Sequence, residues 1–169
     1  MGKTMTLRII KLLLVFSVAI FYSLVVFNNI TDYGSNYQFV RHVMMMDSAF
    51  PGNNGMWRAI NSPTLHTAFY LVIIGWETST MLLCWWGGVR MAQSLTGSMS
   101  AFHQAKRVAM AALARGLLMW LVTFLAVGGE WFLMWQSKSW NGQDAAFRMF
   151  TVIGVVLILL VQPETQDQP

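Results

Sequence analysis

Glu77 is the residue whose position most strongly suggests chemistry, because it lies near the middle of a long apolar segment. An ionisable side chain inside a bilayer is unfavourable by several kcal/mol unless it is neutral, paired or hydrated. Glu77 is therefore interpreted either as a proton or cation site or as a group that joins helices through hydroxyls of residues 78–80, Thr80 among them. Both interpretations require Glu77 to face the interior of a helical bundle. Gly75 and Ser79 have the small-xxx-small spacing that permits close helix packing beside it.

Glu130 is a second carboxylate in an apolar segment. At 1.5 Å per residue we predict it about 9 Å below the outer membrane surface, level with Tyr70, which is its expected hydrogen-bond partner. Arg41 or His42 of the preceding loop could also reach it. We interpret Glu130 as a tie between that loop and its own helix, and the alternative is a relay with Glu77. No Lys or Arg is predicted at mid-span to pair with either carboxylate.

Histidine and methionine side chains gather between the first two apolar segments, which raises the question of a metal site. His42 shares a helix face with Met45 or Met46, and Cu(I) favours imidazole and thioether ligands. Consecutive Met residues point in different directions, however, and Met is also a common apolar filler, so no metal is predicted. A haem between His42 and His66 is the other cofactor considered, and none is predicted. Cys84 is the only cysteine, which excludes an internal disulfide and a CxxC site.

Enzyme and nucleic-acid functions find no support in the sequence. The GxSxG, HExxH, Walker and dinucleotide-binding patterns are absent, so we predict that the protein is not an enzyme. The net charge of +4 comes without a block of basic residues interleaved with aromatics, so no nucleic-acid partner is predicted.

The elements that must position these residues are membrane helices. The chain is 56% hydrophobic and only 11% charged, whereas about 25% of residues are charged in soluble domains. Four segments are apolar for about the length that crosses a bilayer. We therefore predict an all-α four-helix membrane bundle forming one domain over 1–169, with spans over 7–27, 65–88, 113–135 and 145–161, and an outer loop over 28–64.

The outer loop contains a short amphipathic segment. Phe39, Val40, Val43 and Met44 fall on one helical face, which predicts a helix in the membrane interface with that face toward lipid or the bundle. Farther along, an aromatic beside a cation that can extend toward the headgroups indicates a chain that follows the membrane surface. The candidate functional residues of this loop are Arg41, His42, Asp47, Trp57 and Arg58.

The distribution of positive charge predicts the threading. Seven Lys and Arg residues lie at the N-terminus and around the second connection, against four in the outer loop and near the third connection. Cytoplasmic loops carry the excess of Lys and Arg, so both termini are predicted to be cytoplasmic.

The chain resembles a bacterial family of predicted small integral membrane proteins catalogued as a domain of unknown function. The residues that carry the resemblance are in the outer loop, and the likeness extends over most of the chain, including the positions of Glu77 and Glu130. The resemblance implies a bacterial inner-membrane location, and no catalytic residue is carried over. The matching segments are Asn36-Tyr37-Gln38-Phe39-Val40-Arg41-His42-Val43, Met46-Asp47, Pro51-Gly52 and Met56-Trp57-Arg58-Ala59-Ile60.

Four short helices enclose little lumen, which favours an accessory or interaction subunit over a self-contained transporter. The expected partners are the lipid bilayer and either further copies of the chain or another membrane protein. The alternative is a small ion- or proton-coupled transporter or sensor that uses Glu77 and Glu130.

Overall fold

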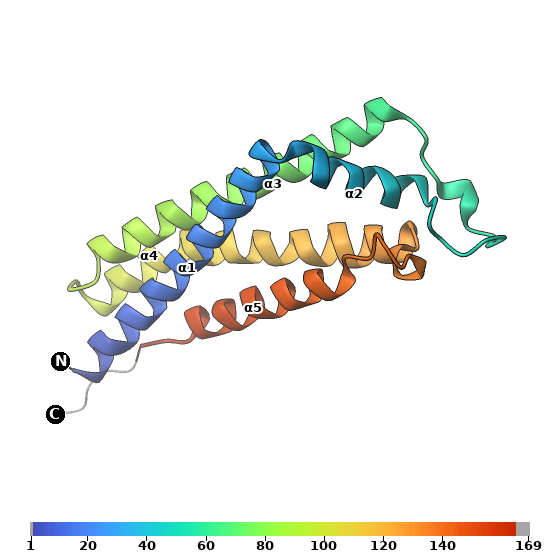
Figure 1. Ribbon diagram of the computed structural model, residues 1–169. Coiled ribbons are helices and arrows are strands. Elements are labelled where there is room, and N and C mark those ends of the chain that lie inside the picture. The colour runs from blue at the N-terminus through green and yellow to red at the C-terminus, as the bar shows by residue number, and fades with distance from the viewer. Residues whose placement is uncertain (1, 165–169) are drawn as a thin grey trace.

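The computed structural model describes residues 2–164 and is a bundle of four long apolar helices, with no strand among those residues. Each of the four is long and apolar enough to cross a membrane, which confirms the predicted all-α membrane fold (Figure 1). In chain order the elements are α1 (Lys3–Thr31), α2 (Tyr33–Met45), η1 (Met56–Arg58), α3 (Pro63–Gln93), α4 (Met99–Leu118), η2 (Met119–Trp131), η3 (Met134–Gln136) and α5 (Gln143–Val161).

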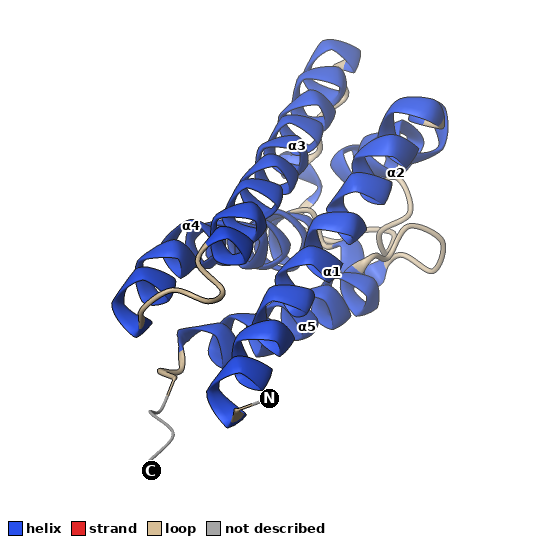
Figure 2. Cartoon of the chain, turned by 90° about the vertical axis from the view of Figure 1, so that its left-hand side faces the viewer, coloured by secondary structure: helices blue, strands red, loops and turns tan. Residues whose placement is uncertain are grey.

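The two ends of the bundle differ in structure. The N-terminus, the end of α5 and the tight turn between α3 and α4 lie together at one end (Figure 1). At the other end lie α2, η1 and the connection before α5. Figure 2 views the bundle from the end where the N-terminus and the α3–α4 turn lie. We call these the inner and outer ends. Four spans that alternate in direction account for this division.

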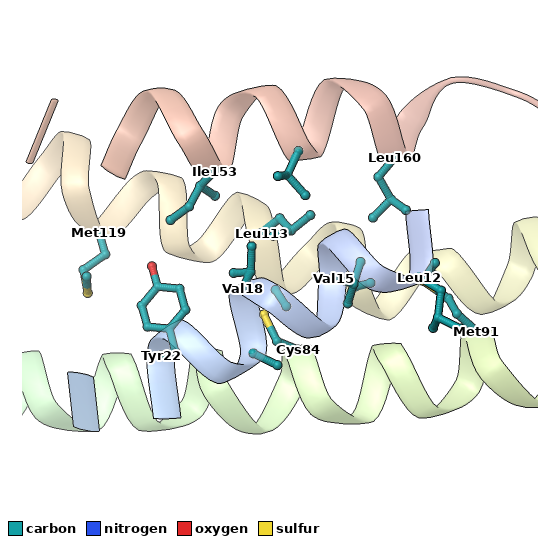
Figure 3. Packing of buried hydrophobic residues seen from close by; sticks show 14 of the residues in the cluster. Leu12, Val15, Val18, Tyr22, Cys84, Met91, Leu113, Met119, Ile153 and Leu160 are labelled. Atoms are coloured by element: carbon teal, nitrogen blue, oxygen red, sulfur yellow. The ribbon is translucent and has the colours of Figure 1, made fainter. Parts of the chain in front are cut away.

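The core of the bundle is filled from all four spans. Val15, Val18 and Tyr22 of α1 lie between Cys84 of α3 and the α4 residue Leu113, in one apolar cluster (Figure 3). Most of these side chains are inaccessible to solvent or lipid. The inner half of the molecule is therefore close-packed.

Helix α3 begins where the sequence predicts. The hydroxyl of Ser62 accepts a hydrogen bond from the Leu65 backbone N–H, and Pro63 occupies the first helical turn, where its missing N–H is tolerated.

The third span begins at Met99, so the start predicted at Leu113 is wrong. Ser98 caps this helix by accepting a hydrogen bond from the Ala101 N–H at 3.1 Å. Residues 94–98 form the expected turn, but Ser100, His103 and Gln104 belong to the exposed side of α4, while small residues such as Ala105 and Ala109 are buried. As a consequence, residues expected at the membrane surface lie within the helix.

Helix α4 continues without a break into η2, a segment of wider π-helical winding. The Phe132 N–H donates to the Val127 carbonyl at 3.0 Å, the five-residue bond of that winding. The helix ends at Trp131 rather than Trp135, and Leu133 adopts a left-handed conformation at φ 53°.

The predicted short helix of the outer loop is α2, and its apolar face is turned toward the bundle. Val43 and Met44 are buried with Phe132 and Met134 in a second, smaller apolar cluster. The Ile60 N–H donates to the Met44 carbonyl at 2.9 Å and fixes the returning chain against α2. The helix therefore rests on the outer end of the bundle.

Candidate functional site

A cavity of about 340 Å³ lies between the helices at the outer end, and α2 contributes part of its wall. Its wall combines amides, one carboxylate and aromatic rings. The lining residues are Val25, Asn28, Asn29, Asn36, Phe39, Val40, Tyr70, Ile73, Glu77, Trp120, Phe124, Gly142 and Ala145.

Glu77 is the one carboxylate in the wall of this cavity, and only 3% of the residue is exposed. It accepts a hydrogen bond from Asn29 Nδ2 of α1 at 2.5 Å. Thr80 is not the partner that the sequence suggested, because its hydroxyl donates to the Trp76 carbonyl of its own helix at 2.9 Å. Glu77 faces the bundle interior and is held by α1.

Asn29 is the centre of the polar network. Its Oδ1 accepts hydrogen bonds from Asn36 Nδ2 at 2.8 Å and from the Tyr70 hydroxyl at 3.1 Å. Together with the bond to Glu77, these contacts join α1, α2 and α3 at one point. The sequence did not indicate this role, because an Asn in the last turn of a helix is also a common residue where a helix ends.

The aromatic rings of three tyrosines stand beside this network. The ring centroid of Tyr33 lies 4.7 Å from that of Tyr70 and 5.8 Å from that of Tyr37. Since Tyr33 and Tyr37 belong to α2 and Tyr70 to α3, the rings attach the first turns of α2 to α3. Of the three rings, that of Tyr70 forms part of the cavity wall.

The expected hydrogen bond between Tyr70 and Glu130 is wrong. Glu130 is exposed in the last turn of η2, because that helix ends four residues earlier than predicted. It does not line the cavity, so it is not brought together with Glu77. The loop does contact η2 at this point, through Arg58 Nη1, which donates to the Glu130 backbone carbonyl at 3.3 Å.

The remaining candidates of the outer loop hold that loop together and do not line the cavity. Arg41 donates to the side chain of Gln38 at 3.3 Å. His42 Nδ1 lies 2.6 Å from Asp47 Oδ2, and the His42 ring stacks on Trp140 at a centroid distance of 4.5 Å.

Trp57 and Arg58 form an aromatic contact at the outermost part of the loop. The rings of Trp57 and Trp131 meet edge to face at 5.7 Å, and the Arg58 guanidinium lies 5.5 Å from the Trp131 ring. This pairing joins η1 to the end of η2.

The His, Cys, Asp and Glu side chains of the described residues were compared for a possible metal centre. Within residues 2–164 no three His, Cys, Asp or Glu side chains are grouped so as to hold an ion. His66 is buried, and its Nε2 lies 2.7 Å from the Ile60 carbonyl oxygen. His42 is paired with Asp47 and not with His66.

A cation does lie at mid-span, contrary to the expectation from sequence. Arg115 falls inside the third span because that helix starts early, and its Nε donates to Ser79 Oγ at 3.0 Å. Its guanidinium also lies 5.0 Å from the ring of Trp76. Arg115 thereby connects α4 to α3 one turn below the cavity.

A second polar cluster closes the inner end. Lys11 Nζ and Lys106 Nζ lie 2.7 and 2.9 Å from Glu164 Oε1, and Lys106 is fully buried. Both lysines also donate to the Gln162 carbonyl. These contacts hold residues 162–164 against the bundle, and residues 165–169 lie outside the described part. We call Lys11, Lys106, Gln162 and Glu164 the tail clasp.

Between the cavity and the tail clasp the centre of the bundle is packed. The Trp120 indole N–H donates to the Tyr22 hydroxyl at 3.1 Å directly below the cavity. Tyr22, Leu113 and Met119 are completely buried beneath that contact. The cavity therefore does not continue through the centre of the bundle, and three of its lining residues, Asn28, Asn36 and Ala145, are exposed.

A family match identifies the class of protein to which this bundle belongs. Residues 7–163 match the family described as "predicted small integral membrane protein (DUF2165)". The chain belongs to that family. No curated protein and no solved structure matches the chain. It is a small integral membrane protein of a family with no assigned activity.

Proposed function

We propose that this protein binds a small organic cation in the cavity beneath α2, with Glu77 as the counter-ion. The observation that supports this function is the composition of the cavity wall. A single buried carboxylate is surrounded by three asparagines and several aromatic rings, and no Lys, Arg or His lies among the lining residues. An intramembrane carboxylate facing a cavity is the usual mark of a cation site.

The wall offers each kind of contact that an amine requires. An ammonium group donates hydrogen bonds, and the Glu77 carboxylate and asparagine amide oxygens accept them. The faces of Tyr70, Trp120 and Phe124 add the attraction of aromatic rings for cations. A volume of about 340 Å³ suits a ligand of modest size, since pockets for drug-sized molecules begin at about 300 Å³.

Binding is favoured over passage across the membrane. Trp120 in the cavity wall is hydrogen-bonded to the buried Tyr22, and the packed core and the tail clasp lie between the cavity and the inner end. A site of this form suits a sensor or an accessory subunit that presents its ligand to a partner in the membrane. The excess of positive charge at the inner end supports a bacterial inner-membrane protein with both termini in the cytoplasm and the cavity on the outer side.

The test is amine binding to the purified protein in lipid nanodiscs, with propylamine as the probe. Trp120 is the one tryptophan of eight that lines the cavity, so the part of the fluorescence change that Trp120→Phe removes reports occupancy. Glu77→Gln is expected to weaken binding about tenfold or more, because a buried charge pair is lost. Glu130→Gln, at an exposed carboxylate outside the cavity, is the matched control and should bind as the unaltered protein does. Equal binding by both variants would overturn the proposal.

A further inference from the structure

We infer that the ligand of the cavity is a single-chain amphipathic amine, whose alkyl chain lies in an apolar groove between α1 and α5. This depends on the function proposed above and specifies the ligand class. The groove has a volume of about 190 Å³ and is lined by Leu14, Ser17, Val18, Phe21, Met149, Val152, Ile153 and Val156.

The chemistry of the groove suits a hydrocarbon chain. Seven of its eight lining side chains are apolar. The eighth, Ser17, donates its hydroxyl to the Leu13 carbonyl of its own helix at 2.9 Å and so offers the groove no free donor. No charged residue contributes to this wall, in contrast to the cavity above it.

The groove and the cavity follow the same seam between two helices. On α1, Phe21 lines the groove and Val25, one turn farther along, lines the cavity. On α5, Met149 lines the groove and Ala145, again one turn away, lines the cavity. From Ala145 to Val156 the seam runs about 16 Å along the helix axis.

The polar cavity at the outer end and the apolar groove below it determine how a ligand would lie. A charged head beside Glu77 would direct an attached chain down the seam toward the middle of the membrane. Val152, which is 51% exposed, and the exposed Ser17 leave the groove open to the bilayer, so a molecule dissolved in the lipid can enter from the side. The groove is too small for a helix, whose diameter with side chains is about 10 Å.

The experiment compares propylamine with dodecylamine in nanodiscs of phosphatidylcholine. Val152→Trp fills the groove, whereas Val155→Trp places the same side chain on α5 at a position that is also 51% exposed but outside the groove. We expect Val152→Trp to weaken dodecylamine binding about tenfold, because the added ring occupies the space of the chain. Propylamine binding should stay unchanged in both variants.

Glu77→Gln separates this inference from the function on which it depends. If Glu77→Gln loses both amines while Val152→Trp and Val155→Trp bind dodecylamine equally, the cation site stands and the chain site is wrong. If Glu77→Gln keeps both amines, the proposed function itself is wrong. If Val152→Trp changes only the amount of phospholipid that co-purifies, a bilayer lipid fills the groove and the inference is overturned.

Discussion

Asn29 is the residue on which the polar wall of the cavity depends. Within the described chain it is the hydrogen-bond partner of Glu77, and it also accepts from Tyr70 and Asn36. A buried polar group that loses its partner destabilises the protein by about 1–3 kcal/mol, and more when the group is charged.

Asn29→Leu is therefore expected to lower the free energy of unfolding by about 2–3 kcal/mol, because Glu77 and Tyr70 both lose a partner. Asn28→Leu alters an adjacent asparagine that is exposed and should change stability by less than about 0.5 kcal/mol. Reversible unfolding in mild detergent measures both. If the two variants unfold alike, Asn29 does not hold the network.

The tail clasp gives the protein a defined response to acid. Burial raises the pKa of Glu164, but hydrogen bonds and charge from Lys11 and Lys106 outweigh burial and leave the pKa below its ordinary value of 4.5. A carboxylate with a lowered pKa stabilises the folded state above its unfolded pKa, and this contribution disappears as pH falls through the folded pKa.

We expect the tail to remain docked at pH values above 4.5 and to be released as the pH falls farther. A fluorophore on Gln162→Cys, in a Cys84→Ala background, follows the release. In the same background Glu164→Gln should already be undocked at neutral pH, because two buried lysines then lack a carboxylate. A tail signal that ignores both acid and Glu164→Gln would contradict the clasp.

Sequence reasoning located the unusual residues better than it located their partners. Glu77 stands out because a charge in an apolar segment is rare. Its partner Asn29 lies 48 residues away, and the contact depends on where α1 ends relative to α3. Glu164 gave no signal at all, since a carboxylate in a polar tail is indistinguishable from a solvated one until the chain is folded.

At the scale of helices, α3 and α4 approach each other closely at Gly87. A Cβ added there would lie 2.6 Å from the Ala109 backbone nitrogen and 2.7 Å from its Cα. Because neither backbone can move alone, the two helices would have to separate. Small residues at such crossings are what allows membrane helices to pack tightly.

Gly87→Ala is expected to destabilise the bundle by about 2–3 kcal/mol through this overpacking. Gly75→Ala is the matched control on the same helix, since nothing lies within 4 Å of its added Cβ. Gly75→Ala should be neutral or stabilising by up to about 1 kcal/mol, because alanine favours the helix. Thermal unfolding in detergent compares the pair, and a larger loss at Gly75 would refute the assigned crossing.

Gly75 also shows why contacts between helices were harder to predict than the helices themselves. The spacing of Gly75 and Ser79 suggested a packing surface, yet Gly75 is exposed and meets no neighbour. Small residues are necessary for close packing but do not say which face meets another helix. Which face packs depends on the position of the neighbouring helix. Here that helix is α4, which starts at Met99 and not at the predicted Leu113.

For the whole molecule, the length of the apolar segments was enough to predict four spans. It was not enough to predict how far each helix extends relative to its neighbours. Glu77 is near the middle of α3, but its partner Asn29 is in the last turn of α1. α3 therefore continues for about 21 Å beyond the level of Glu77. The space beside this extension is where α2 and the cavity lie, so the site follows from unequal helix heights rather than from a motif.

Threading decides which compartment the cavity faces, and three exposed serines report it. Ser98 lies at the inner end, and Ser35 and Ser139 lie at the outer end. With Cys84 buried, single cysteines at these positions can be labelled selectively in intact cells with a membrane-impermeant maleimide. We expect labelling at Ser35→Cys and Ser139→Cys but not at Ser98→Cys, because the six inner-end cations that remain once Arg115 is placed at mid-span should stay in the cytoplasm. The reverse pattern would turn the cavity toward the cytoplasm, and its amines would then have to be intracellular.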